Sequence, residues 1–246
     1  MRTMCTVSFV PVGDKVLIAS NRDEKHWRDA ALPPQGYDTV TGKIWYPRDA
    51  HAGGTWLGVH EKGTAVVLLN GGFVKHEPSP LYEKSRGLVL LDLLKTKSPY
   101  DHFRSYPLEF IEPFTLVIWQ DQHLFECRWD GSKKHSLPLN KEIPHIWSSV
   151  TLYPPEIIAK RKNWFEKWLV DHPEPNLKDL LHFHEHTGDG DRENDLLMNR
   201  DDQVFTVSIT GMELGKNNGE IRYLDIQTRQ SAQQSLHFTQ VPLIEL

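Results

Sequence analysis

The chain has 246 residues and a mass of 28.5 kDa, which is enough to bury a large hydrophobic core without disulfides or metal ions. Its 28 lysines and arginines against 33 aspartates and glutamates give a net charge of −5, which argues against a protein that binds nucleic acid through a basic surface. No apolar segment approaches the roughly 20 residues of a membrane-spanning helix. Two cysteines, Cys5 and Cys127, do not suggest a disulfide scaffold, and we expect a cytoplasmic protein.

The first 70 residues have the patterns of β-strands. Cys5–Val12 and Lys15–Ser20 flank Gly13-Asp14, a dipeptide suited to a two-residue hairpin turn. Trp56–His60 and Thr64–Asn70 flank a short polar turn in the same way. We therefore expect two β-hairpins in this part of the chain.

A helix and a further pair of strands are expected next. Tyr82–Leu94 carries leucines at helical spacing, and Ser79 is a candidate for its N-terminal cap. Phe114–Trp119 and His123–Trp129 are two strand-like segments with only a few residues between them. This spacing predicts a third hairpin.

The clearest helical pattern lies in Glu156–Val170, whose isoleucines, tryptophans and Phe165 form one apolar stripe. Asn176–His184 predicts a second, shorter helix, and strands return at Gln203–Thr210 and Ile221–Ile226. Many antiparallel strands, interrupted by a few helices, indicate an α+β protein in which helices cover sheet faces, rather than a parallel βαβ fold.

Cys5 is the first residue with candidate chemistry, because Met4 directly precedes it. Initiation at Met4, followed by removal of that methionine, would make Cys5 the N-terminal residue. An N-terminal cysteine carries both a thiol and an α-amine with a pKa near ~8, and this amine can serve as the base. The alternative is that Cys5 is a small buried hydrophobic residue on a strand, as a lone cysteine often is.

The second strand offers partners for this thiol. A turn centred on Gly13-Asp14 places Cys5 directly opposite Arg22, with Cβ atoms ~5 Å apart. A guanidinium group at that distance would favour the thiolate, and Asp23 would accept a hydrogen bond from the α-ammonium group of a processed Cys5. A shift of one residue in the turn would remove this pairing. The alternative for Asn21–Glu24 is a solvated strand end.

Four short motifs, in order along the chain, resemble those of the NRDE family, which includes the transport and Golgi organisation 2 proteins. They are Met4-Cys5, the N-R-D-E of Asn21–Glu24, the G-G-T-W-L-G of Gly53–Gly58 and the S-R-G of Ser85–Gly87. Two further stretches resemble the bacterial branch of the family: I-W-S-S at Ile146–Ser149 and G-D-G-D-R-E-N-D from Gly188. The resemblance spans nearly the whole chain.

The resemblance implies a fold similar to N-terminal nucleophile hydrolases, a four-layer αββα sandwich of antiparallel sheets, as a single domain over residues 1–246. It also implies that cysteine is the first residue after processing. Cysteine members of that superfamily, such as choloylglycine hydrolases, place an arginine and an aspartate soon after the nucleophile, and Arg22 and Asp23 stand at the matching positions. Animal members carry a Ser-Asn pair where this chain has Ser148-Ser149, so the resemblance does not extend to a second polar contact there.

Asn70, in L-L-N-G-G, ends a predicted strand before two glycines that allow a ligand to approach the backbone. Its place resembles the oxyanion-hole asparagine of those hydrolases, and such a donor lowers the barrier by roughly 3 kcal/mol. The alternative is an asparagine that ends a strand in a left-handed turn. The catalytic set is therefore Cys5, Arg22, Asp23 and Asn70. The expected substrate-binding residues are Asn21, Gly53, Gly54, Thr55, Trp56 and Gly71, and Trp56 is equally suited to the core.

Two other signals are weaker. His182, His184 and His186 would lie on one face of a strand, but the neighbouring leucines predict a helix, on which only His182 and His186 meet. We therefore expect no metal site there. Cys127 alternates with apolar residues on a predicted strand and is expected to be structural.

Two functions from different classes fit these residues. The first is a cysteine amidohydrolase that cleaves a linear C–N amide bond through a thioester on Cys5 and needs neither cofactor nor metal. The second is a non-catalytic carrier of a hydrophobic ligand, such as a lipid, acyl-CoA or haem, in which a cysteine ligates the iron and His26 or His51 assists. In both, the partner is a small molecule, an amide or a lipid-like ligand, and not a nucleic acid.

Overall fold

The computed structural model describes residues 6–77 and 79–239, which form two seven-stranded sheets whose strand pairs are all antiparallel. The first, sheet A, has the order β10-β1-β2-β12-β13-β14, and β11 pairs with β12 beside this path. Its strands are β1 (Thr6–Val12), β2 (Lys15–Lys25), β10 (His145–Ser148), β11 (Asn199–Arg200), β12 (Val204–Leu214), β13 (Asn218–Asp225) and β14 (Ser231–His237).

The second sheet, sheet B, follows chain order from β3 to β9. Its strands are β3 (Leu32–Thr39), β4 (Gly42–Arg48), β5 (Leu57–His60), β6 (Ala65–Asn70), β7 (Phe114–Gln120), β8 (His123–Trp129) and β9 (Lys134–Leu139). Each strand of sheet B therefore pairs with its neighbours in the sequence. In sheet A, by contrast, the β2–β12 pair joins a strand from the first part of the chain to a strand from the last part.

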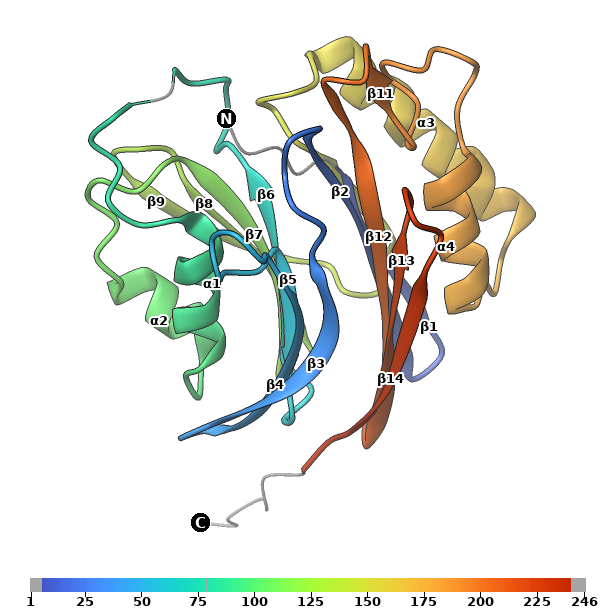
Figure 1. Cartoon of the computed structure of the whole chain (residues 1–246). Helices are drawn as coiled ribbons and strands as arrows, with labels where there is room; N and C mark the ends of the chain where they lie inside the picture. Colours follow the sequence, from blue (N-terminus) through green and yellow to red (C-terminus); the bar gives the residue numbers. More distant parts are fainter. Residues whose placement is uncertain (1–5, 78, 240–246) are drawn as a thin grey trace.

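In the described part of the chain, four helices cover the outer faces of the two sheets. They are α1 (Arg86–Leu94), α2 (Pro99–Ser105), α3 (Pro155–Asp171) and α4 (Leu177–His186). Figure 1 shows α1 and α2 outside sheet B and α3 and α4 outside sheet A, with the sheets facing each other between them. This is the expected four-layer αββα sandwich. Among the described residues, no helix is long and apolar enough to cross a membrane.

Strand β6 illustrates why the layers form. All six of its residues are buried, and successive residues point to opposite faces. Val67 and Leu69 join the core between the sheets, while Val66 and Leu68 join the core beneath α1. A strand that is covered on both sides must be apolar throughout, and this explains the V-V-L-L of its sequence.

The expected hairpins and the two later helices are confirmed, but α1 begins later than predicted. The cap is Ser85 rather than Ser79: its side chain accepts a hydrogen bond from the Leu88 N–H, and its own backbone is extended. The residues before Ser85 therefore lie outside the helix, although Tyr82 was predicted as its start. Helix α2, which the apolar pattern did not predict, is capped by Ser98 and starts with Pro99.

Candidate functional site

The β1–β2 hairpin has the predicted register. Val12 pairs with Lys15 at the turn, and Thr6 pairs with Asn21 at the far end. The pairing of Cys5 with Arg22 is the next step of this register, but Cys5 lies outside the described residues. The structure therefore shows the predicted register as far as the pair of Thr6 with Asn21.

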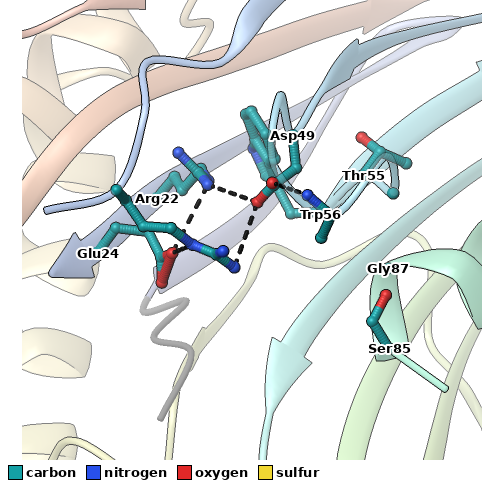
Figure 2. Close-up of a pocket in the computed structure, with 10 residues that line it drawn as sticks. Arg22, Glu24, Asp49, Thr55, Trp56, Ser85 and Gly87 are labelled. Atoms are coloured by element: carbon teal, nitrogen blue, oxygen red, sulfur yellow. Dashed lines mark hydrogen bonds and ion pairs between the residues drawn. The ribbon is translucent and has the colours of Figure 1, made fainter. Parts of the chain in front are cut away.

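Arg22 lies in a closed ring of four charged side chains (Figure 2), of which Arg22 and Glu24 are buried and Arg28 and Asp49 are partly exposed. Its Nη2 is 2.8 Å from Asp49 Oδ2 and 3.6 Å from Glu24 Oε2. Arg28 contacts the same two carboxylates, through Nε at 2.5 Å from Glu24 Oε2 and Nη2 at 3.5 Å from Asp49 Oδ2. Two cations alternate with two anions, so the ring has no net charge. The guanidinium group of Arg22 is thus held in one position by partners on both sides.

The loop before β5 holds Asp49 in place for this contact. Asp49 Oδ1 accepts hydrogen bonds from the backbone N–H groups of His51 at 3.0 Å and Ala52 at 2.7 Å. This leaves Oδ2 directed at Arg22, whose guanidinium carbon is 4.7 Å from the centre of the Trp56 ring. Trp56 is buried, and it forms a cation–π contact with the arginine from the side of sheet B.

The G-G-T-W and S-R-G motifs pack against each other backbone to backbone. A Cβ atom on Gly54 would lie 2.7 Å from the carbonyl carbon of Gly87, and one on Gly87 would lie 2.7 Å from the Thr55 carbonyl oxygen. The Thr55 hydroxyl donates to the backbone carbonyls of Pro47 and Leu57. These glycines therefore bring the start of α1 against the wall of the pocket.

A first pocket opens at this junction, and it gathers several of the predicted residues. It is lined by Arg22, Glu24, Arg28, Asp49, Ala52, Gly54, Thr55, Trp56, Ser85 and Gly87. Gly53 is adjacent in the chain and has a positive φ of 70°, which turns the loop towards Gly54. Three of the predicted binding residues thus share one pocket with Arg22.

Asn70 and Gly71 belong to a second pocket, with Ser148 and Ser149. Asn70 is buried at the end of β6, and its backbone carbonyl accepts a hydrogen bond of 2.9 Å from the Ser149 hydroxyl. Gly71 has a φ of 86°, and a Cβ atom there would lie 2.7 Å from both Val150 and Thr151 side chains. The end of β6 is thus joined to the end of β10, whose Ser148 pairs with Thr6.

Asn21, which is also expected among the substrate-binding residues, lies apart from both of these pockets. Successive side chains of β2 alternate between faces, so Asn21 points away from the Arg22 side and towards α4. Its amide group donates to the backbone carbonyls of His184 at 3.2 Å and Leu196 at 2.7 Å, and its Oδ1 is 2.5 Å from His184 Nδ1. It is not among the residues that line the two pockets described above.

Asp23 shares this second face. Its carboxylate accepts hydrogen bonds from the hydroxyls of Thr206 at 2.6 Å and Tyr153 at 3.2 Å. The ladder between β2 and β12 is irregular at this point, because Val207 is an extra residue between the partners of Asp23 and Arg22. Arg22 and Asp23 therefore flank the strand from opposite sides.

The helical arrangement predicted for His182 and His186 and the buried position predicted for Cys127 are confirmed. The rings of His182 and His186 stack at 4.2 Å on α4, while His184 points into the core. Among residues 6–77 and 79–239, no cluster of histidine, cysteine and acidic side chains has a metal-binding arrangement. Cys127 is fully buried, and burial raises the pKa of its thiol to about 12.

Sequence reasoning missed Asp49, Arg28 and Arg161. Asp49 is 27 residues from Arg22, and only the β3–β4 hairpin brings them together. Arg161 is fully buried on α3, where it donates to the Thr6 hydroxyl and to the carbonyls of Asn194 and Asp195. An arginine on an otherwise amphipathic helix carries no local signal of such a role.

The fold is shared with solved amide hydrolases. The chain is similar to a Caenorhabditis elegans N-acylethanolamine-hydrolyzing acid amidase ortholog, with 13% identity, a TM-score of 0.57 and 85% and 92% of the two chains covered. A variant of conjugated bile acid hydrolase from Clostridium perfringens is 11% identical, with a TM-score of 0.59 and with 98% of this chain and 100% of that chain covered. Penicillin V acylase from Agrobacterium tumefaciens is 9% identical, with a TM-score of 0.56 and with 92% of this chain and 84% of that chain covered. These likenesses show the fold of N-terminal nucleophile hydrolases.

A comparison of the sequence with curated proteins finds no match. The sequence model of one family, described as Transport and Golgi organisation 2, matches residues 4–209, which is most of the chain and includes all four motifs. The chain therefore belongs to the transport and Golgi organisation 2 family, and it has the fold of the N-terminal nucleophile hydrolases.

Proposed function

We propose that this protein is a cysteine amidohydrolase in which Cys5, as the N-terminal residue, attacks the carbonyl carbon of a linear amide. The observation that carries the proposal is the β1–β2 register, in which Thr6 lies opposite Asn21, because one further step of this register would bring Cys5 opposite Arg22. The amide hydrolases that share the fold support the same class of reaction. The cytoplasmic location inferred from the two cysteines remains part of this proposal.

In this reaction the Cys5 thiolate forms a bond to the carbonyl carbon, and the C–N bond breaks. The α-ammonium group of Cys5 gives a proton to the leaving amine, and water then hydrolyses the thioester to release the acid and restore the thiol. Arg22 stabilises the thiolate, Asp23 orients the α-amine, and Asn70 donates to the oxyanion. Gly54, Thr55 and Trp56, with Gly53 and Gly71, shape the walls around the substrate.

The ion-pair ring suits Arg22 to this role, because it holds the guanidinium group in position. An arginine free in solution would lose side-chain entropy on contacting a thiolate, whereas Asp49 and Glu24 already hold this one. Arg28 offsets the two carboxylates, so that their charges do not cancel the effect of Arg22 on the thiol.

The reactivity of Cys5 tests this proposal. Iodoacetamide at pH 6.5 should alkylate Cys5 well before Cys127, because a cation lowers the thiol pKa below ~8.5, while burial keeps Cys127 protonated. Arg22→Ala should raise the pKa of Cys5 by about one unit and slow its alkylation about tenfold at this pH. Arg22→Lys should keep part of the effect. Peptide mass spectrometry after timed quenching measures both sites.

Arg104→Ala is the matched control, since Arg104 is an exposed arginine on α2 outside the pocket. It should leave both rates unchanged. If Cys127 reacts first, or if the rate of Cys5 labelling does not change in Arg22→Ala, the hypothesis that Cys5 is an activated nucleophile is wrong. The second candidate, a carrier of a hydrophobic ligand, would then be favoured, because the chain has a large apolar groove beside Asn70.

A further inference from the structure

A groove lies between the loop after β6 and the start of α3, and it is larger than the two pockets described above. It contains about 1250 Å³ of space, part of it open to solvent. Its walls are mainly apolar, with Phe73 and Val74 on one side and Tyr153, Pro154, Ile158 and Ala159 on the other. Figure 1 shows the loop after β6 and the segment before α3 at the same end of the sandwich.

Phe73 and Val74 are unusually exposed for apolar residues next to one another, at 51% and 72%. Their loop is nevertheless held in place, because Arg128 Nη1 donates to the Gly72 carbonyl at 2.6 Å and the Arg128 guanidinium lies 4.9 Å from the centre of the Phe73 ring. Glu126 fixes Arg128 in turn with two hydrogen bonds. A preformed apolar wall of this kind suits a ligand.

The groove continues into the pocket of Asn70. Val150 and Ile158 line both cavities, so the apolar groove and the polar pocket meet at these two side chains. A ligand that lies across them has a polar group beside Asn70 and an apolar part beside Ile158. The arrangement suits an amphiphile rather than a uniformly polar molecule.

The charges of the groove have one sign. Lys75 and Lys162 are the charged residues among its described walls, and no acidic residue lines it. Among the described residues Lys75 has no carboxylate within ion-pair distance, and Lys162 contacts Glu166 at 3.7 Å. Lys162 lies one helical turn, about 6 Å, beyond Ile158, away from the Asn70 pocket. In a chain of net charge −5, this end of the groove is locally positive.

We propose that the groove binds the apolar chain of an amphiphilic anion, with its negative charge at Lys75 and Lys162 and its amide carbonyl beside Asn70. This rests on the proposed function for the carbonyl end only. The ligand is a single amphiphile and not a membrane surface, because the groove is a cavity that continues inward to a buried asparagine. The lysines discriminate against cationic and neutral chains of the same length.

Binding of dodecanoate tests the groove without any catalysis. The chain with Cys5→Ser should bind dodecanoate in isothermal titration calorimetry, and Ala159→Trp, which fills the groove from an exposed position of α3, should weaken binding more than about tenfold. Val170→Trp is the matched control, since Val170 is 81% exposed on the same helix and does not line the groove. It should bind as tightly as the parent.

Charge is tested by three probes of equal chain length: dodecanoate, dodecanol and dodecyltrimethylammonium. The double substitution of Lys75→Gln and Lys162→Gln should weaken the binding of dodecanoate by about three- to tenfold and leave the binding of dodecanol unchanged. Equal binding of the three probes, or binding of dodecanoate by Ala159→Trp at the parent affinity, would overturn the proposal. So would binding to anionic lipid vesicles without binding of free dodecanoate. Because Cys5 is replaced throughout, loss of the nucleophile hypothesis would leave these results unaffected.

Discussion

Successive side chains of β2 point to opposite faces of the sheet, so neighbouring residues contact different parts of the molecule. Arg22 faces Trp56 and the pocket between the sheets, while Asn21 faces the buried ring of His184 beneath α4. Both nitrogens of that ring are engaged: Nδ1 donates to Asn21 Oδ1, because the amide nitrogen of Asn21 is itself a donor, and Nε2 accepts from the Ser8 hydroxyl at 2.7 Å. Burial and the charge of Arg161 disfavour the protonated ring, so the ring is neutral and Nε2 is an acceptor, and the two contacts tie α4 to β1 and β2.

A pH-dependent stability follows at this residue. Burial, and then the charge of Arg161, lower the pKa of His184 from 6.5 to about 3. Below pH 6.5 the unfolded chain binds a proton at His184 that the native state does not bind, so stability falls as the pH falls from about 6.5 towards 3. Between pH 6 and 4, the free energy of unfolding of the parent should fall by about 1 kcal/mol per pH unit more than that of the His184→Gln variant. Urea unfolding at several pH values measures this difference.

His182→Gln serves as the control for this comparison. His182 is exposed two residues away on the same helix, so its variant should keep the pH slope of the parent. Parallel slopes for the parent and His184→Gln would contradict a neutral buried imidazole.

At the level of elements, α1 is attached to sheet B through glycine rather than through side chains alone. The Thr55 N–H donates to the Gly87 carbonyl at 3.3 Å, and the Gly87 Cα lies against the Thr55 backbone. A side chain at either Gly54 or Gly87 would push the helix off the strand. The two motifs are thus far apart in the sequence but form one structural joint.

Gly87→Ala tests this joint. An alanine favours the helix by about 1 kcal/mol, but its Cβ would lie 2.7 Å from a backbone oxygen that cannot move alone, and such overpacking costs up to about 3 kcal/mol. We expect a net loss of about 2 kcal/mol in the free energy of unfolding, measured by urea titration. Gly215→Ala, whose nearest neighbour would be 3.2 Å away, should lose less. Equal losses in the two variants would refute the close approach.

For the whole molecule, the start of the first strand is where the two sheets and the candidate chemistry meet. Thr6 pairs with Asn21 and with Ser148, and its hydroxyl accepts a hydrogen bond from the buried Arg161. Ser149, the residue directly after β10, donates a hydrogen bond to the backbone carbonyl of Asn70 in sheet B. Both sheets and α3 therefore meet at Thr6, the first residue that the structure describes.

A comparison of two chains tests the proposed role of the terminus. A chain that begins at Cys5 should hydrolyse the mono-p-nitroanilide of dodecanedioic acid, which keeps a free carboxylate at its far end, whereas a chain that keeps Met1–Met4 should be inactive, since its Cys5 has no free α-amine. Both should unfold at the same temperature, because the hairpin from Thr6 onward is the same in both. Absorbance of released p-nitroaniline and differential scanning calorimetry give the two readouts.

A chain that begins at Thr6 is the control and should be inactive although folded. Equal hydrolysis by the chain that keeps Met1–Met4 would rule out the α-amine as the base. Intact-mass spectrometry of protein from its own cell should find Cys5 as the first residue.

The sequence by itself determined the features that depend on local chemistry. The Gly13-Asp14 turn set the register of β1 with β2, and the apolar stripe around Phe165 marked α3 within one or two residues. The motifs indicated the fold through their resemblance to a known family, and the structure shows that two of their glycines, Gly54 and Gly87, are required by close backbone packing. Such features are readable because turns and periodicity act between residues that are near in the chain.

Only the tertiary structure decided which side chains share a pocket. Asp49 reaches Arg22 through the sheet B hairpin, and Val207 shifts the ladder beside Asp23, neither of which has a local signal. The face of β2 on which Asn21 lies also depended on which layer covers it, so its N-R-D-E motif divides between the pocket and the core beneath α4. Strand pairing joins segments that are distant in sequence, and its free energy comes from packing that no single segment contains.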